Sequence, residues 1–131
     1  MRIQVKDFMI TSVVTATIDT KVKEIRDLMH YNGIHAVPII SYSKELPKNK
    51  TTIEGIVTIS DLIKITDENK AIEEFMTKAV HVVHQNSSAQ AAAKMMIKHD
   101  VHHIVVMKNG EIVGIISSAD FVKLVADHTL D

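Results

Sequence analysis

The chain has 131 residues, of which 46% are apolar and 4% aromatic, and its formal net charge is −1. This composition suits one compact unit, or two very small ones, with an aliphatic core. The balanced charge gives no electrostatic basis for binding nucleic acid or an anionic membrane surface. The absence of cysteine excludes disulfides and thiolate metal sites. Because there is also no signal peptide and no apolar run approaching the ~18 residues of a membrane span, we expect a soluble cytoplasmic protein.

In chain order, each half of the sequence predicts a strand, a helix, two strands and a helix. The helices are assigned from apolar residues at helical spacing. The second strand of each half is an unbroken apolar run, which is typical of burial on both faces, and Asn109-Gly110 predicts a hairpin turn. In the first half, strands are predicted at 13–17 and 37–40 and helices at 21–32 and 60–65. In the second half, strands are predicted at 80–84, 104–107 and 112–116, a helix at 119–126, and another helix over the apolar positions from Ala89 to Ile97.

Helix starts and one loop are also predicted from local patterns. Asp19 and Thr20 offer a cap for the first helix, and Ser87 followed by Gln90 has the pattern of a capping box. The polar segment 41–52 is expected to be a surface loop.

An internal duplication relates the two halves. A shift of 67 residues aligns Phe8-Met9 with Phe75-Met76, and Ile34-His35 with Val101-His102. Past residue 52 the shift falls to 59, because segment 41–52 is longer than its counterpart. We therefore expect two repeats, 1–66 and 67–131, in one structural domain.

One short pattern occurs in both repeats, as Gly55–Leu62 and as Gly114–Phe121. Each copy has glycine, two β-branched apolar residues, a hydroxyl residue, two variable residues, aspartate and a large apolar residue. The hydroxyl and the carboxylate then lie where a strand runs into a helix. There they can cap the helix. They can equally accept hydrogen bonds from a vicinal diol such as that of ribose, with the anionic end of the ligand near a helix N-terminus. The pattern alone leaves both interpretations open.

The paired units resemble CBS domains, named after cystathionine β-synthase, in the tandem arrangement called a Bateman module. The resemblance implies an α+β (α/β) fold with two β-α-β-β-α CBS repeats packed sheet to sheet as one pseudo-twofold module, with two clefts between the repeats. It also implies AMP, ADP, ATP or S-adenosylmethionine as ligand, no required cofactor, and a homodimer that forms through the helices. The residues that carry the resemblance are Phe8-Met9, Gly33–Ile39 and Gly55–Leu62, with Phe75-Met76, Val101–Val106 and Gly114–Phe121 in the second repeat.

The same resemblance implies which residues line the clefts. Asp61 and Asp120 match the family's ribose-binding aspartate, and Thr58 and Ser117 match the hydroxyl beside it. Adenine is expected to lie against Ser12-Val13 or Ala79-Val80, at the start of the first strand of a repeat, and against Ile56 or Ile115. The predicted ligand-binding set is Ser12, Val13, Ile34, His35, Ala36, Pro38, Ile56, Thr58, Ser60, Asp61, Ala79, Val80, Val101, His102, His103, Ile115, Ser117, Ala119 and Asp120.

Clefts of the family usually combine the aspartate of one repeat with the second strand of the other. Asp61 is therefore expected to share a cleft with His102-His103, and Asp120 with His35-Ala36. Nucleotide-binding relatives often have arginine at these positions, whereas histidine is only partly charged at neutral pH, so we expect weaker, pH-dependent or one-sided phosphate binding. Val105 stands where the first repeat has Pro38, which predicts two unequal clefts. The cleft of Asp61 is favoured because two histidines, His102 and His103, are expected to face it.

Eight histidines leave a second interpretation open, a metal- or pH-responsive module. Adjacent strand residues such as His102 and His103 point to opposite faces, and no ligand cluster completes a set, so no metal site is predicted. A third interpretation is a purely structural interaction or dimerisation domain. No nucleophile–base arrangement is present, so we predict no catalytic residues and no enzyme. The leading prediction is a regulatory module that senses a ligand and signals to a protein target in trans, through a change of conformation.

Overall fold

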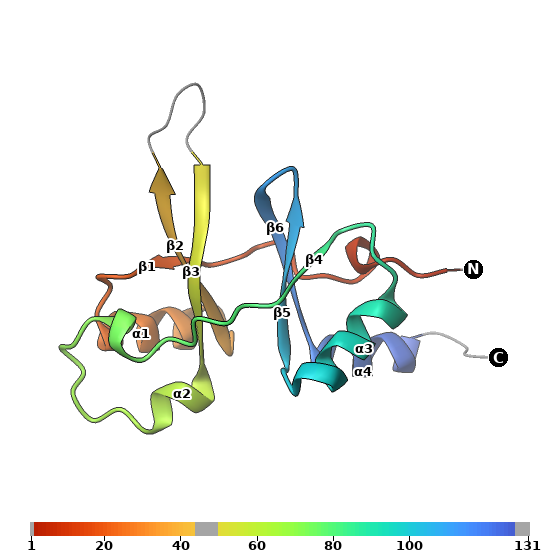
Figure 1. Cartoon of the computed structure of the whole chain (residues 1–131). Helices are drawn as coiled ribbons and strands as arrows, with labels where there is room; N and C mark the ends of the chain where they lie inside the picture. Colours follow the sequence, from red (N-terminus) through yellow and green to blue (C-terminus); the bar gives the residue numbers. More distant parts are fainter. Residues whose placement is uncertain (1, 44–49, 128–131) are drawn as a thin grey trace. The chain divides into compact units, whose positions relative to one another are not determined.

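The computed structural model describes residues 2–43 and 50–127, and these residues form two compact units. The contiguous unit is Val14–Val80. The discontinuous unit combines residues 2–13 with residues 81–127. Each unit has one three-stranded sheet with its helices beside it (Figure 1).

The contiguous unit contains the expected strand, helix, strand, strand and helix, followed by one short helical turn. Strand β1 is parallel to β2, and β2 is antiparallel to β3. The elements are β1 (Ala16–Thr17), α1 (Val22–Asn32), β2 (Ala36–Ser43), β3 (Lys50–Thr58), α2 (Ile59–Ile63) and the 3-10 helix η2 (Ile72–Glu74).

The discontinuous unit repeats this arrangement. Strand β4 is parallel to β5, and β5 is antiparallel to β6. The element order that the sequence predicts twice is thus confirmed, as is the α+β fold class. The elements are the 3-10 helix η1 (Val5–Asp7), β4 (Val82–His84), α3 (Ala89–His99), β5 (His103–Lys108), β6 (Glu111–Ser117) and α4 (Ser118–Asp127).

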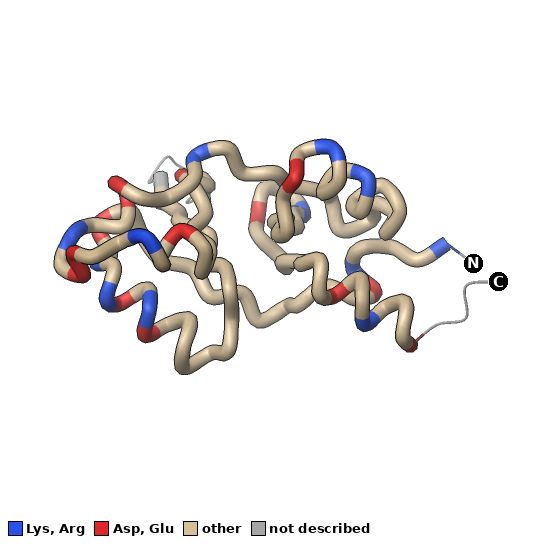
Figure 2. The backbone as a smooth tube through the Cα atoms, turned by 90° about the horizontal axis from the view of Figure 1, so that it is seen from below, with Lys and Arg blue, Asp and Glu red and all other residues tan. Residues whose placement is uncertain are grey.

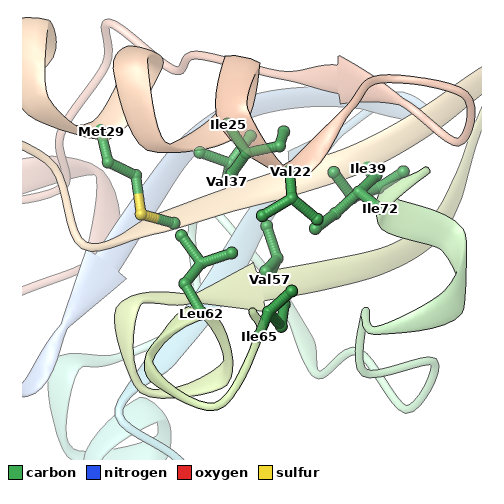
Figure 3. Packing of buried hydrophobic residues seen from close by; sticks show 9 residues of the cluster. All are labelled: Val22, Ile25, Met29, Val37, Ile39, Val57, Leu62, Ile65 and Ile72. Carbon is green, nitrogen blue, oxygen red and sulfur yellow. The ribbon is translucent and has the colours of Figure 1, made fainter. Parts of the chain in front are cut away.

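An aliphatic core holds the helices of the contiguous unit against its sheet (Figure 3). Val22, Ile25 and Met29 recur at helical spacing on α1 and are all buried. They pack with Val37 and Ile39 of β2. Burying a side chain of this size contributes about 1.5–3 kcal/mol to the free energy of unfolding. The corresponding core of the discontinuous unit consists of Val5, Val83, Ala92, Met96, Ile104, Val106 and Ile116.

The N-terminal arm of each repeat, residues 3–13 in the first and 70–80 in the second, packs in the unit that holds the body of the other repeat. Val5 is fully buried in the discontinuous unit, and Ile72, its counterpart 67 residues later, is fully buried in the contiguous unit. The ranges 1–66 and 67–131 therefore describe the duplication of the sequence. In the folded units, residues 3–13 belong with residues 81–127, and residues 70–80 belong with the body of the first repeat.

The start of α1 agrees with the prediction to within one residue, but its predicted cap is wrong, and an arm takes the place of that cap. Neither Asp19 nor Thr20 caps α1, because its N-cap is Lys21, which makes no side-chain cap. The carbonyl of Lys70 instead accepts from the N–H of Val22 at 3.0 Å. Backbone carbonyls of the second repeat thus satisfy the first N–H groups of α1, which would otherwise lack partners.

The predicted capping box at Ser87 and Gln90 is also wrong by one residue. The N-cap of α3 is Ser88, whose Oγ accepts from the N–H of Ala91 at 3.0 Å. The carbonyl of Ile3 accepts from the N–H of Ala89 at 2.8 Å, so this helix too begins against an arm.

Two predicted boundaries differ from the observed ones. The first strands are shorter than predicted, since β1 and β4 begin at Ala16 and Val82. The expected loop 41–52 is too long, because residues 41–43 belong to β2 and residues 50–52 to β3. The remainder of that predicted loop, residues 44–49, lies outside the described residues.

Charges of both signs are interspersed along each unit (Figure 2). This distribution agrees with the net charge of −1. In the part of the chain that the structure describes, no helix is long and apolar enough to cross a membrane.

Candidate functional site

The repeated motif of the contiguous unit forms a capping box where β3 runs into α2. Thr58 is the N-cap, and its Oγ1 accepts from the N–H of Asp61 at 3.4 Å. In return, Oδ2 of Asp61 accepts from the N–H of Thr58 at 2.9 Å. The carboxylate is half-buried, and its charge lies in the first turn, where the helix dipole favours an anion.

The second copy of the motif makes the same box with one more hydrogen bond. Oδ2 of Asp120 accepts from the N–H of Ser117 at 2.8 Å and from its Oγ at 3.2 Å. Asp120 is the buried charged residue of the described core, with 7% of its surface exposed. The capping role that the sequence allowed is therefore real for both aspartates.

Capping leaves the second carboxylate oxygen of each aspartate available. Within residues 2–43 and 50–127, no hydrogen bond reaches Oδ1 of Asp61 or Asp120. No fully buried side-chain oxygen in this part of the chain lacks a partner, so neither Oδ1 atom is fully buried. Each motif can thus cap its helix and still accept a hydrogen bond from a ligand.

The start of each second strand lies beside the motif of its own unit. Ala36 pairs with Thr58, and His103 pairs with Ser117. The carbonyl of His35 accepts from the N–H of Ile59, and that of His102 accepts from the N–H of Ser118, both at 2.9 Å. Ile59 and Ser118 are the first residues of α2 and α4. His35 and His102 are exposed, whereas Ala36 and Pro38 are buried in β2. The expected pairing of aspartates and histidines across the repeats concerns both units together and stays a prediction.

The residues expected to lie against adenine flank the points where the chain passes from one unit to the other. Ser12 and Val13 end the arm of the discontinuous unit. Two residues before Ser12, Ile10 exchanges backbone hydrogen bonds with Ile115, at 2.9 and 3.0 Å. The structure thus places Ser12 and Val13 in the unit of Ser117 and Asp120, although by sequence the first two belong to repeat 1–66 and the last two to repeat 67–131.

The contiguous unit has the matching arrangement. Ile56 exchanges two backbone hydrogen bonds of 2.9 Å with Thr77, close to Ala79 and Val80. Ile56 is buried, Val80 is half-buried and Ala79 is exposed. By unit, the predicted set divides into two groups: Ile34, His35, Ala36, Pro38, Ile56, Thr58, Ser60, Asp61, Ala79 and Val80 in the contiguous unit, and Ser12, Val13, Val101, His102, His103, Ile115, Ser117, Ala119 and Asp120 in the discontinuous unit.

A pocket of about 420 Å³ lies between α1 and α2 of the contiguous unit. Two predicted residues, Ile34 and His35, line it, and Asp61 does not. Its remaining lining residues are Arg26, Met29, His30, Gly33, Ile59, Leu62 and Ile63.

Arg26 is a residue of this pocket that the sequence analysis did not single out. Its guanidinium donates to the carbonyls of Leu62 at 2.8 Å and Ile65 at 2.7 Å, and to Glu68 at 2.6 Å. Arg26 thus satisfies carbonyls at the C-terminal end of α2. Its partners lie 36 to 42 residues away, and no local pattern in the sequence could have revealed them.

The histidines do not assemble into a metal centre in the described part of the chain, where no group of three potential ligands is found. His81 and His84, expected on one strand, have separate roles. The ring of His81 stacks on that of His99. Nδ1 of His84 accepts from the N–H of Asn86 at 3.1 Å.

Comparisons with known proteins agree with this architecture. Among solved structures, the CBS domain pair of protein MJ0100, in complex with 5′-methylthioadenosine and S-adenosyl-L-methionine, is 26% identical with a TM-score of 0.83, covering 97% of this chain and 98% of that one. Among curated relatives, the uncharacterized protein MJ1225 of Methanocaldococcus jannaschii is 27% identical over 92% of this chain. The inosine-5′-monophosphate dehydrogenase of Aquifex aeolicus is 34% identical over 88% of this chain. This chain spans 42% of the first relative and 23% of the second.

The family model of the CBS domain matches twice, over residues 5–68 and over residues 72–127. The two matches take in most of the sequence and coincide with the duplication. Each corresponds to one copy of the strand, helix, strand, strand, helix order. The chain therefore belongs to the CBS domain family and carries two CBS domains in tandem.

Proposed function

We propose that this chain is a regulatory module that binds an adenosine-containing ligand and passes its occupancy to a protein partner by a change of conformation. The observation that carries the proposal is the duplicated aspartate, which caps a helix with Oδ2 while its Oδ1 has no hydrogen-bond partner among the described residues and is not fully buried. A ribose diol offers donors to such an oxygen, and a hydrogen bond to a charged acceptor contributes about 1.5–3 kcal/mol. The complex of the MJ0100 pair with two adenosyl compounds supports this ligand class.

Within this class we propose an adenosyl compound without phosphate in preference to ATP. Both ligands named for the MJ0100 pair lack a phosphate group. The residues before the second strands of this chain are His35 and His102, which are exposed, and neither carries the permanent charge of the arginine often found there in nucleotide-binding relatives. A triphosphate would therefore bind with weak charge compensation, whereas the ribose contact would be unaffected.

Of the two motifs, that of Asp61 is proposed to dominate binding. Asp61 is half-buried and accepts one hydrogen bond within its unit, whereas Asp120 is buried and accepts two. The carboxylate of Asp61 therefore has more free capacity to accept hydrogen bonds from a ligand.

Isothermal titration calorimetry with S-adenosylmethionine, 5′-methylthioadenosine, AMP, ADP and ATP tests the proposal. We expect an adenosyl compound without phosphate to bind most tightly, and Asp61→Asn to weaken its binding by about tenfold or more, the equivalent of one charged hydrogen bond. Asp120→Asn should have a smaller effect. Asp27→Asn, at an exposed position of α1, is the matched control and should leave affinity unchanged.

Thermal unfolding of each variant without ligand separates loss of the helix cap from loss of binding. A ligand present at 100 times its Kd should add about 2.7 kcal/mol to the free energy of unfolding. If none of the five compounds produces heat or stabilises the protein, the proposal fails, and a metal- or pH-responsive module or a purely structural interaction domain is left. An Asp120→Asn effect equal to or larger than that of Asp61→Asn would overturn the proposed asymmetry alone.

A further inference from the structure

A pair of stacked histidines lies where the chain enters the discontinuous unit for the second time. The ring centroids of His81 and His99 are 4.2 Å apart, and the ring planes are inclined by 24°. His81 is the first residue after the passage from the contiguous unit and directly precedes β4. His99 is the last residue of α3. The stack therefore fastens the start of this segment to the end of a helix.

The fold of the repeat does not require this contact. At a shift of 67 residues, the counterparts of His81 and His99 are Val14 and Asn32. Val14 is likewise the first residue after a passage between units. The side chain of Asn32 donates to the carbonyl of Leu28 at 2.8 Å, within its own helix. The chain thus has a titratable pair at the passage before His81, whereas the counterparts at the passage before Val14 are not titratable.

The geometry of the pair favours proton uptake over metal coordination. The lone pairs of an imidazole lie in the plane of its ring, so two nearly parallel stacked rings cannot both direct a nitrogen at one metal ion. In the described part of the chain, no group of three potential ligands includes them. Protonation, in contrast, would place two positive charges in adjacent stacked rings.

The groups around the pair oppose that second charge. The pKa of His99 is lowered below its ordinary value. The largest cause is partial desolvation of its ring, followed by the charge of His81 and then that of Lys98. The carboxylate of Asp100, in the turn from α3 into β5, would instead favour the charge, and the imidazoles of His102 and His103 follow it in the sequence. The C-terminal end of α3 would favour a cation, but the carbonyls of Met96 and Ile97 already accept from the N–H groups of Val101 and Asp100.

We propose that the His81–His99 stack is a pH-sensitive clasp, which holds the start of β4 against α3 while the rings are neutral and opens when they take up protons. The direction of the pH dependence follows from the linkage between proton binding and folding. Because the pKa of His99 is lowered in the folded state, the unfolded chain binds this proton more readily. The stabilisation by the clasp is fully present above the ordinary histidine pKa, about 6.5, and is lost progressively as pH falls below it.

A nuclear magnetic resonance titration of the whole chain from pH 8 to pH 5 tests the clasp through two readouts. The ring protons of His81 and His99 report their protonation. The amide of Val105, which donates to the carbonyl of His81 at 3.1 Å, reports whether the segment is held. We expect His99 to titrate below the ordinary histidine range and the exchange protection of Val105, corrected for intrinsic rates, to fall severalfold over the same interval.

His99→Phe keeps an aromatic ring for stacking but cannot be protonated. In this variant the protection of Val105 should stay constant over the same pH range. His30→Phe is the control, because His30 makes an edge contact with Tyr31 in the other unit, and it should leave the response of Val105 unchanged.

In the wild-type chain alone, an ordinary pKa for His99 combined with constant protection of Val105 would overturn the proposal, even if the variants fail to fold. A loss of protection in His99→Phe equal to that of the wild type would also overturn it. Added Zn²⁺ that shifted the ring signals of both histidines at neutral pH would point to coordination instead. The outcome does not depend on whether an adenosyl ligand binds.

Discussion

Gly55 and Gly114, which open the two copies of the motif, are explained by the close approach of an arm. A Cβ atom at Gly55 would lie 2.7 Å from Sδ of Met76 and 2.8 Å from the carbonyl oxygen of Thr77. At Gly114 it would lie 2.5 Å from Sδ of Met9 and 3.1 Å from the carbonyl oxygen of Ile10. The glycine therefore makes room for the backbone bridge between the arm and the third strand of the unit.

Substitution of these glycines tests that explanation. Gly55→Ala should lower the free energy of unfolding by about 1–3 kcal/mol, the usual cost of overpacking a core. Gly114→Ala should cost less, because a flexible methionine can move and the nearest backbone atom is farther away. Urea denaturation of the two variants gives the comparison. Unchanged stability of Gly55→Ala would show that the arm is not packed in this way.

At the scale of the elements, the helices of both units carry exposed apolar side chains, and one pair lies at equivalent positions. Ile63 on α2 is 78% exposed, and its counterpart Val122 on α4 is 69% exposed. Tyr31 on α1 and Ile97 on α3 are exposed as well. Ile63 also borders the pocket between α1 and α2. These positions fit the expectation from the sequence that a homodimer forms through the helices.

If a second copy binds there, Ile63→Lys should weaken dimerisation by tenfold or more. The variant loses the burial of an isoleucine, about 1.5–3 kcal/mol for each copy, and adds an unpaired charge. Sedimentation equilibrium measures the change. Tyr42→Lys is the control, because Tyr42 is exposed on β2 instead of a helix. A wild-type chain that is monomeric, or equal dimerisation of both variants, would contradict the proposed interface.

For the whole molecule, the arm of each repeat packs in the unit that holds the body of the other repeat, which we call the exchange of arms. This exchange determines which part of the chain can fold alone. The fragment 14–80 contains its complete core, including Ile72 and the partly buried Phe75 and Met76. The fragment 1–66, which follows the sequence repeat, lacks all three and carries the arm of the other unit.

The fragment 14–80 should therefore unfold cooperatively and 1–66 should not. Losing a single fully buried isoleucine costs about 2–5 kcal/mol, a large part of the stability of a small domain. Circular dichroism during thermal unfolding distinguishes the two. Equal stability of both fragments would mean that the arms contribute little to the cores.

The sequence predicted the elements well and the tertiary contacts poorly, for physical reasons. Apolar runs and the Asn109-Gly110 turn, where both residues have positive φ, are local patterns, and they identified the strands of both sheets. The cap of α1 by Lys70 and the bonds of Arg26 join residues about 36 to 48 positions apart. Such contacts depend on topology and leave no local pattern. For the same reason, the duplication revealed two repeats and not the exchange of their arms.

The exchange of arms also fixes an order of assembly during synthesis. The contiguous unit is complete once residue 80 has been made, whereas the N-terminal arm must wait for β5, β6 and α3. Until then Val5, Phe8 and Met9 have no core to enter. Folding of the contiguous unit first replaces a flexible loop with a compact body, which lowers the entropy cost of bringing the arm to its partner. A nascent chain paused between the two stages would hold one finished unit and an apolar N-terminal segment accessible to chaperones.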